Sequence, residues 1–255
     1  MGVMRKRIKP IVVYVVLALL GLALVIANIH NTSKQQAHLQ NVKSAIPSAT
    51  TPKTTTSSTS SSSDEELKLN PIIDLSGWQL PQDIDYDVLS NHISGAIIRV
   101  FGGSQISKDS NAASSNGVDK SFKTHIKELK KRDVPVAVYS YAQGTSVKEM
   151  KEEARIFYKN ASPYKPTYYW IDVEEETMPN MEEGVQAFLA ELKRLGADKV
   201  GLYIGAYFML EQEVSTKNFD AVWIPAYGTD SGYYEALPNT EIDYDLHQYT
   251  SQGSL

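Results

Sequence analysis

Cysteine is absent from the 255 residues of the chain. A disulfide framework, a cysteine-ligated zinc or iron–sulfur site and a thiol nucleophile are therefore excluded. The five histidines are scattered, and no run of Asp and Asn has the spacing of a calcium-binding loop. We therefore expect the protein to use no cofactor and no metal ion.

Basic residues are sparse in the C-terminal part of the chain. From Pro71 onward, the chain has 17 Lys and Arg residues and 27 Asp and Glu residues, which gives a net charge of -10. Nucleic-acid binding requires a basic surface, so this part excludes nucleic acid as a partner. Aromatic residues are missing between Tyr14 and Trp78. A packed core must therefore lie in the C-terminal part.

The sequence has one long apolar run, at residues 11–27. Its length is at the lower end of the ~17–25 residues that span a bilayer as a helix. Four basic residues precede it, which favours a cytoplasmic N-terminus. We expect a cytoplasmic basic segment at 1–10 and a single-pass transmembrane signal-anchor at 11–29. The alternative is a signal peptide cleaved after Ala27, and both place the C-terminal part outside the cell.

Residues 30–70 are predicted to be a flexible linker. Between residues 44 and 63, 14 of the 20 positions are Ser or Thr. Such a segment buries too little apolar surface to offset the entropy of ordering its backbone. We interpret it as a spacer that lets the following domain reach into the cell envelope.

The remaining residues, 71–255, alternate short apolar runs with amphipathic segments. This pattern is typical of an α/β fold with a largely parallel sheet, either open or closed into a barrel. The predicted strands are residues 72–75, 95–101, 134–141, 168–173, 200–204 and 221–225, and the predicted helices are residues 120–132, 147–158 and 181–195. In barrels of this kind the functional side chains lie at the carboxyl ends of the strands.

Carboxylates follow two of these predicted strands. Asp172 and Glu174 end the run YYWIDVE, and their spacing of two places both side chains on one face of a strand. Asp74 ends the first strand, close to Trp78. Two carboxyls in one low-dielectric site raise the pKa of one while the other stays ionised, which supplies the acid and the charged partner of glycoside hydrolysis. A helix-capping acidic loop is the alternative for Asp172 and Glu174.

Aromatic residues gather at other predicted strand ends, among them Tyr139, Tyr141, Trp223 and Tyr227. Aromatic rings beside carboxylates suit a sugar-binding cleft, because the rings stack on pyranose faces. Taken singly, each ring also fits an ordinary role in the core.

Several ordered motifs run through this segment: IIDLSGWQ, GAIIRVFGG, GVDKSFKTHIKELKKRDVPVAVYSYA, EEARIFY, YWIDVEE, LGADKVGLYIGAYF, FDAVWIPAYG and LHQYTSQG. At these motifs the chain resembles glycoside hydrolase family 25, the muramidases of bacterial peptidoglycan. The resemblance implies an irregular (β/α), TIM-barrel-like fold. It also implies lysozyme-type hydrolysis of the β-1,4 bond between N-acetylmuramic acid and N-acetylglucosamine.

The resemblance further implies roles for individual residues. Glu174 is similar to the general acid, Asp172 to the residue that stabilises the oxocarbenium-like state or orients the 2-acetamido group, and Asp74 to a further active-site carboxylate. Whether a protein nucleophile or the substrate's own acetamido group attacks stays open. The residues expected to bind substrate are Tyr139, Tyr141, Trp223, Tyr227, Gln248 and Arg99.

The sequence departs from the family at its end, where we expect the last strand and its Asp-x-Asn motif to be missing from the domain at 71–255. Two functions therefore remain. The first is an active muramidase for wall remodelling or local wall opening. The second is a catalytically impaired peptidoglycan-binding or scaffold protein that uses the same cleft. We expect a monomer in either case.

Overall fold

The computed structural model describes residues 70–235 and 237–253. The predicted basic segment, the membrane segment and all but the last residue of the linker lie outside these residues. Within the described part, no helix combines the length and the apolar character needed to cross a bilayer.

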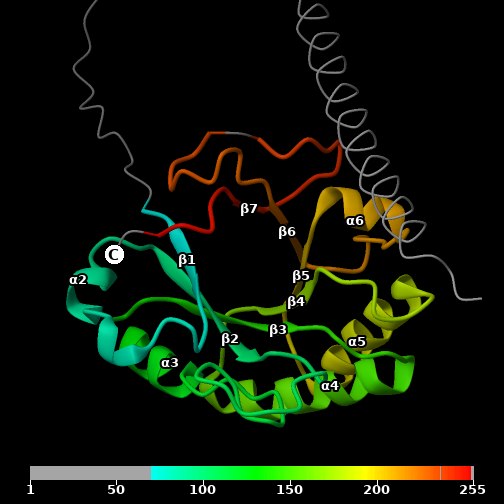
Figure 1. Ribbon diagram of the computed structural model, residues 1–255, viewed down its shortest axis with the longest axis horizontal. Helices are drawn as coiled ribbons and strands as arrows, with labels where there is room; N and C mark the ends of the chain where they lie inside the picture. The colour runs from blue at the N-terminus through cyan, green and yellow to red at the C-terminus, as the bar shows by residue number, and fades with distance from the viewer. Residues whose placement is uncertain (1–69, 236, 254–255) are drawn as a thin grey trace, which may run out of the picture. The chain divides into compact units, whose positions relative to one another are not determined.

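One parallel sheet organises the described residues. Its strands follow the order of the chain, each pairing in parallel with the next, and the sheet curls into a half-barrel (Figure 1). The strands are β1 (Ile72–Leu75), β2 (Gly95–Phe101), β3 (Val136–Tyr141), β4 (Tyr169–Val173), β5 (Val200–Ile204), β6 (Ala221–Pro225) and β7 (Leu246–Gln248). This arrangement confirms the predicted α/β fold with a parallel sheet.

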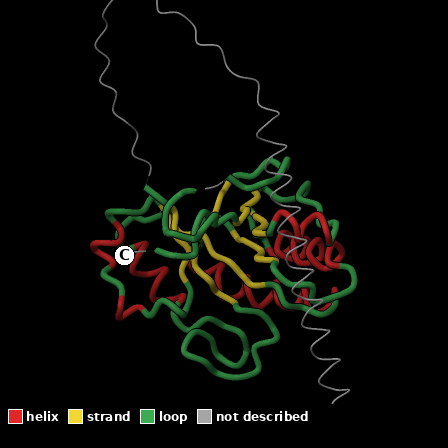
Figure 2. Tube along the Cα trace, turned by 45° about the horizontal axis from the view of Figure 1, so that its top comes forward, coloured by secondary structure: helices red, strands yellow, loops and turns green. Residues whose placement is uncertain are grey.

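Helices connect the strands. They are α2 (Tyr86–Ser90), α3 (Phe122–Lys130), α4 (Val147–Ala161), α5 (Met181–Leu195) and α6 (Ala206–Glu211), with short 3-10 turns at η1 (Pro81–Asp83) and η2 (Ser162–Tyr164). Helices α3, α4 and α5 lie along the convex face of the sheet (Figure 1). Figure 2 shows the strands in the middle of the domain with helices around them.

Local chemistry sets the ends of the two longest helices. The Ser146 hydroxyl accepts a hydrogen bond from the Glu149 backbone N–H at the start of α4, and the Asn180 side chain accepts one from Glu183 at the start of α5. Helix α5 ends at Gly196, whose φ of 105° only glycine adopts without strain. Their apolar faces then pack onto the sheet with fully buried side chains such as Phe157 and Phe188.

Most predicted elements begin and end at or close to the expected residues, but two short helices and one short strand were not predicted. Strand β3 begins at Val136 instead of residue 134, and α4 continues to Ala161, three residues beyond the predicted end. Strand β7 and helices α2 and α6 were not predicted. Strand β7 has three residues, all half-buried, and therefore lacks the apolar alternation from which strands are predicted.

The concave face of the sheet carries a second, smaller core. Strand alternation places Ile97, Ala137, Trp170, Ala221 and Trp223 there. The rings of Trp170 and Trp223 meet edge to face at 5.7 Å. Gly201 of β5 makes room for the indole of Trp170, because a Cβ at this glycine would lie 2.3 Å from the ring.

The last connection of the half-barrel differs from the others. Strands β6 and β7 are joined by residues 226–245, in which the described positions form no helix. This connection lies over the concave side of the sheet (Figure 1). Strands β1 and β7 are the two ends of the sheet and do not pair with each other. The concave side is therefore bordered by loops, whereas the convex side is covered by helices.

Candidate active site

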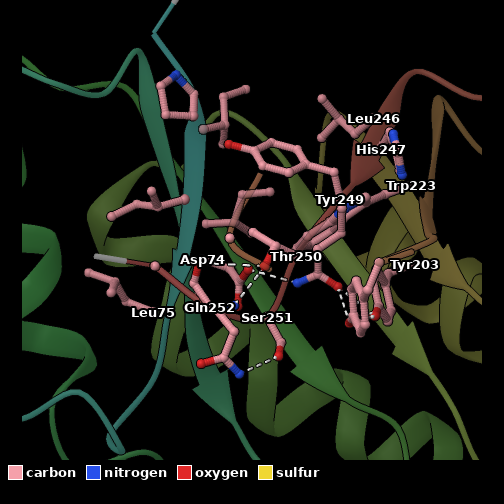
Figure 3. Close-up of a pocket in the computed structure, with 18 of the residues that line it drawn as sticks. Asp74, Leu75, Tyr203, Trp223, Leu246, His247, Tyr249, Thr250, Ser251 and Gln252 are labelled. Atoms are coloured by element: carbon pink, nitrogen blue, oxygen red, sulfur yellow. Dashed lines mark hydrogen bonds between the residues drawn. The ribbon is translucent and has the colours of Figure 1, made fainter. Parts of the chain in front are cut away.

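A cavity of about 1120 Å³ lies on the concave side of the sheet, at the carboxyl ends of the central strands and along the whole of β1 and β7. Residues of all seven strands line it together with the segment that follows β7 (Figure 3). Among the predicted site residues, those that line it are Asp74, Tyr139, Asp172, Glu174, Trp223, Tyr227 and Gln248. The sheet topology thus brings together side chains separated by up to 174 positions in the sequence.

Asp172 and Glu174 come from β4 and the residue just after it. Asp172 is 6% exposed, whereas Glu174 is exposed to the cavity. Burial raises the pKa of Asp172 well above its usual value, and the neighbouring charge of Glu174 and a hydrogen bond with Glu174 raise it further. Burial likewise raises the pKa of Glu174. The pair therefore keeps a proton at pH values where isolated carboxyls are ionised.

Asp74 stands at the end of β1 on the same side of the sheet. Burial raises its pKa, while a hydrogen bond from Gln248 opposes the shift. Among the ion pairs of the described residues, none involves Asp74, Asp172 or Glu174. The site therefore holds three carboxyls whose charge is not balanced by a paired cation. In the same residues, no group of three or more His, Cys, Asp or Glu side chains is arranged so that it could hold a metal ion.

A chain of hydrogen bonds crosses the cavity. The Gln248 Nε2 donates to Asp74 Oδ2 at 2.8 Å, and the Gln248 Oε1 accepts from Tyr203 at 2.8 Å and from Tyr227 at 2.6 Å (Figure 3). Tyr203 also packs edge to face on Trp223, with 4.6 Å between ring centroids. Aromatic rings on β5, β6 and the loop after β6 thus form a wall facing the carboxyls.

Two predicted site residues do not line the cavity. The Tyr141 hydroxyl donates a hydrogen bond to Glu175 at 2.8 Å, and Glu175 directly follows Glu174 in the chain. Arg99 of β2 pairs with the buried Asp119 at 3.0 Å. The same Asp119 carboxylate accepts the Gly77 backbone N–H at 2.7 Å, so it joins the β1 turn to β2.

Sequence reasoning missed other residues of the cavity wall. Tyr203 was not among the predicted site residues, although it lies directly beside Asp172 in the sheet register. The segment after β7 was not assigned a role. Asp230 holds this segment by accepting hydrogen bonds from Ser251 and Thr250 at 2.6–2.8 Å. No local sequence signal indicates this long-range contact.

A smaller pocket of about 300 Å³ lies at the amino ends of the strands. Trp170 lines this pocket and does not line the larger cavity. It lies two residues before Asp172 on the same strand face, one layer deeper in the half-barrel. The indole therefore belongs to the layer of side chains below Asp172 and lines only the smaller pocket.

This arrangement has the parts of a glycoside-cleaving site. A carboxyl of raised pKa can give a proton to a leaving oxygen, and ionised carboxylates nearby can stabilise positive charge at the sugar carbon. Aromatic walls suit the apolar faces of sugar rings.

Comparisons with known proteins agree with this chemistry. The family model described as glycosyl hydrolases family 25 matches residues 73–255. A glycosyl hydrolase 25 of Streptococcus pneumoniae, the virulence factor GHIP, is 56% identical, with 73% of this chain and 81% of that chain covered and a TM-score of 0.71. The catalytic domain of endolysin ply40 from bacteriophage P40 of Listeria monocytogenes is 26% identical, with 73% and 87% covered and a TM-score of 0.62.

A lysozyme from Streptomyces coelicolor shares the fold at 18% identity, with 74% of this chain and 87% of that chain covered and a TM-score of 0.54. No curated protein matches the chain. The family model covers most of the chain, including Asp74, Asp172 and Glu174. The chain therefore belongs to glycosyl hydrolase family 25 and is a glycoside hydrolase of the lysozyme type.

Proposed function

We propose that the domain hydrolyses the β-1,4 bond between N-acetylmuramic acid and N-acetylglucosamine in peptidoglycan. The observation that carries this proposal is the meeting of Asp74, Asp172 and Glu174 in one aromatic-walled cavity, without a paired cation. Family membership supports the reaction class, and the wall of tyrosines and Trp223 supports a polysaccharide substrate.

Glu174 is the general acid of the proposed reaction. It is exposed to the cavity and its raised pKa favours the protonated form that an acid requires. It donates this proton to the oxygen of the leaving N-acetylglucosamine as the bond from that oxygen to the muramic acid C1 breaks. Water then adds to C1 and returns a proton to Glu174, which restores the starting state.

Asp172 and Asp74 assist this step. The charge of Glu174 and a hydrogen bond with it raise the pKa of Asp172, after the larger effect of burial, so the two carboxyls titrate as a coupled pair. The buried position of Asp172 suits either orientation of the substrate's 2-acetamido group or stabilisation of the oxocarbenium-like state. Asp74, on the neighbouring side of the cavity, provides a further negative charge near the reacting carbon.

Zymography on purified cell wall tests the proposal. Wild type should clear the wall, and Glu174→Gln should not. Glu176→Gln is the matched control, because Glu176 lies on the same loop but does not line the cavity. Muramic acid at the new reducing ends would support the assigned bond, whereas N-acetylglucosamine there would contradict it. Wall binding without clearing by wild type would instead favour the scaffold function.

We also propose that residues 11–29 anchor the protein in a bacterial membrane, with the catalytic domain outside the cell. The basic residues before this apolar run support the orientation. Cell fractionation tests it: full-length protein should stay with membranes after a high-salt wash and be accessible to external protease. Release of a shortened protein into the medium would favour the cleaved signal peptide.

A further inference from the structure

The two edge strands of the half-barrel are joined across its opening by one side chain. Strands β1 and β7 do not pair through their backbones. Within the described residues, the hydrogen bond from Gln248 to Asp74 is the one hydrogen bond that links these two strands. It also ends on a carboxyl that lines the cavity.

The hydrogen-bond partners fix the orientation of the Gln248 amide. The amide oxygen can only accept, and it faces the hydroxyls of Tyr203 and Tyr227. The amide nitrogen can only donate, and it faces Asp74 Oδ2 at 2.8 Å. With the amide reversed, its oxygen would face a carboxylate oxygen, an arrangement that requires a protonated Asp74.

We propose that Gln248 is a positioning residue that bridges the open edge of the sheet and holds Asp74 as an ionised hydrogen-bond acceptor. The proposal rests on the function proposed above, because it concerns a carboxyl of the same site. The two tyrosines act through Gln248, since their hydroxyls hold the amide in the orientation that presents its nitrogen to Asp74.

The surroundings of Asp74 make this bridge necessary. The titratable and charged groups that face it are Tyr139 of β3, Asp172 and Glu174 at β4, and Tyr227 after β6. All are neutral or acidic. Arg99, the nearby cation on β2, is engaged by Asp119. Among the described side chains, Gln248 is therefore the one that donates to Asp74.

Two variants of Gln248 should move opposite limbs of the pH profile of kcat/KM. Gln248→Ala removes the hydrogen-bond donor, so Asp74 ionises only at higher pH. The acid limb of the profile should therefore move up by about one pH unit. At pH values below that limb, kcat/KM of the variant should be about tenfold lower than that of wild type. Gln248→Glu keeps the shape and still accepts from both tyrosines, but it donates to Asp74 only while protonated. Its alkaline limb should therefore move to lower pH.

Gln82→Glu is the matched control, because Gln82 is exposed and does not line the cavity. Thermal melts show that each variant is folded. Limbs that stay in place while kcat falls equally at all pH values would overturn the proposal, since a structural bridge alone predicts that outcome. Unchanged activity in both variants would overturn it as well.

Direct titration separates this proposal from the proposed function. The carboxyl carbon of Asp74, followed by NMR in protein labelled at Asp, should titrate about one unit higher in Gln248→Ala than in wild type. This readout does not require turnover. If wild type hydrolyses wall but the Asp74 titration is the same in both proteins, the bridge fails and the function stands. If wild type is inactive yet the titration shifts, the function fails and the bridge stands.

Discussion

The convex and concave faces of the same sheet bury different chemistry. Toward the helices, the sheet buries a continuous apolar core that includes Phe157, Phe188 and Leu192, each fully buried. Toward the cavity, it buries Trp170 and Trp223 beside the carboxyl of Asp172. Alternation along each strand thus places one set of residues in the helix-side core and the other set on the face that carries the site.

Two buried carboxyls, one on each side of the sheet, differ in their partners. On the helix side, the carboxylate of Glu191 pairs with Arg155 at 2.7 Å and with Arg194 at 2.6 Å. In the cavity, Asp172 has no such partner, and its Oδ1 makes no hydrogen bond in the described residues. Paired charge leaves a protein stable, whereas an unpaired buried carboxyl keeps a proton available for chemistry.

The largest expected effect is on activity alone. Glu174→Gln should lower kcat by about 10²–10⁴-fold, because the general acid loses its proton. Its melting temperature should stay near that of wild type. If Glu174→Gln lost as much stability as a variant of a core residue, the cavity face would also contribute to stability, and the distinction between the two faces would be wrong.

A change on the helix side should have the opposite result, with a loss of stability and no loss of activity. Phe157→Ala should lower the free energy of unfolding by about 3–5 kcal/mol, because it empties a fully buried site between α4 and the sheet. The folded fraction should keep its kcat. Urea unfolding gives the first quantity, and activity normalised to folded protein gives the second. A lower normalised kcat would mean that the two faces are coupled.

The paired charge predicts a pH dependence of stability. Hydrogen bonds from Arg194 and Arg155 lower the pKa of Glu191 to about 2 from the ordinary 4.5. A lowered folded-state pKa stabilises the protein above pH 4.5, and that stability is lost as the pH falls toward 2. Urea unfolding of wild type and Glu191→Gln should therefore show a difference that shrinks over this range. A constant difference would contradict the role of the ion pairs.

A smaller effect should come from Glu175, which accepts the Tyr141 hydroxyl beside the site. Its charge raises the pKa of Glu174, after the larger effect of burial. Glu175→Gln keeps the acceptor oxygen for Tyr141 but removes the charge. The alkaline limb of the kcat profile should move to lower pH by less than about one unit. No movement, or the same movement in Glu176→Gln, would show that the charge of Glu175 does not act on Glu174.

The smallest effect on stability should come from Trp78, an aromatic residue that lies on neither face of the sheet. Trp78 is 64% exposed, although hydrogen bonds of Ser76 and Asp119 hold its turn. Trp78→Ala should therefore change the free energy of unfolding by about 0.5 kcal/mol or less. A change as large as that of Phe157→Ala would show that exposure is a poor guide to stability in this domain.

The sequence predicts the strands that carry apolar runs and the meeting of the carboxyls. Strands β2, β5 and β6 have the predicted bounds, because their buried residues produce a strong local signal. Asp74 and Asp172 converge because carboxyl ends of parallel strands share one edge of a sheet.

Contacts made by distant segments could not be predicted. The position of β7 depends on pairing with β6 and on Asp245, whose carboxylate accepts the Val222 backbone N–H at 2.8 Å. Arg99 was expected at the substrate, but its partner Asp119 comes from a loop 20 residues later. Gln248 lines the cavity, where it was expected to bind substrate, but its hydrogen bonds with Asp74, Tyr203 and Tyr227 were not predicted.

The indole of Trp170 occupies space that Gly201 leaves free on the neighbouring strand, because a Cβ at this glycine would lie 2.3 Å from the ring. Trp170 pairs with Gly201 in the register of β4 and β5, and Asp172 follows two residues later on the same face of β4. A larger residue at position 201 would push the indole away and shift the strand that carries Asp172. A glycine that makes no contact with substrate thus helps to set where the buried carboxyl stands.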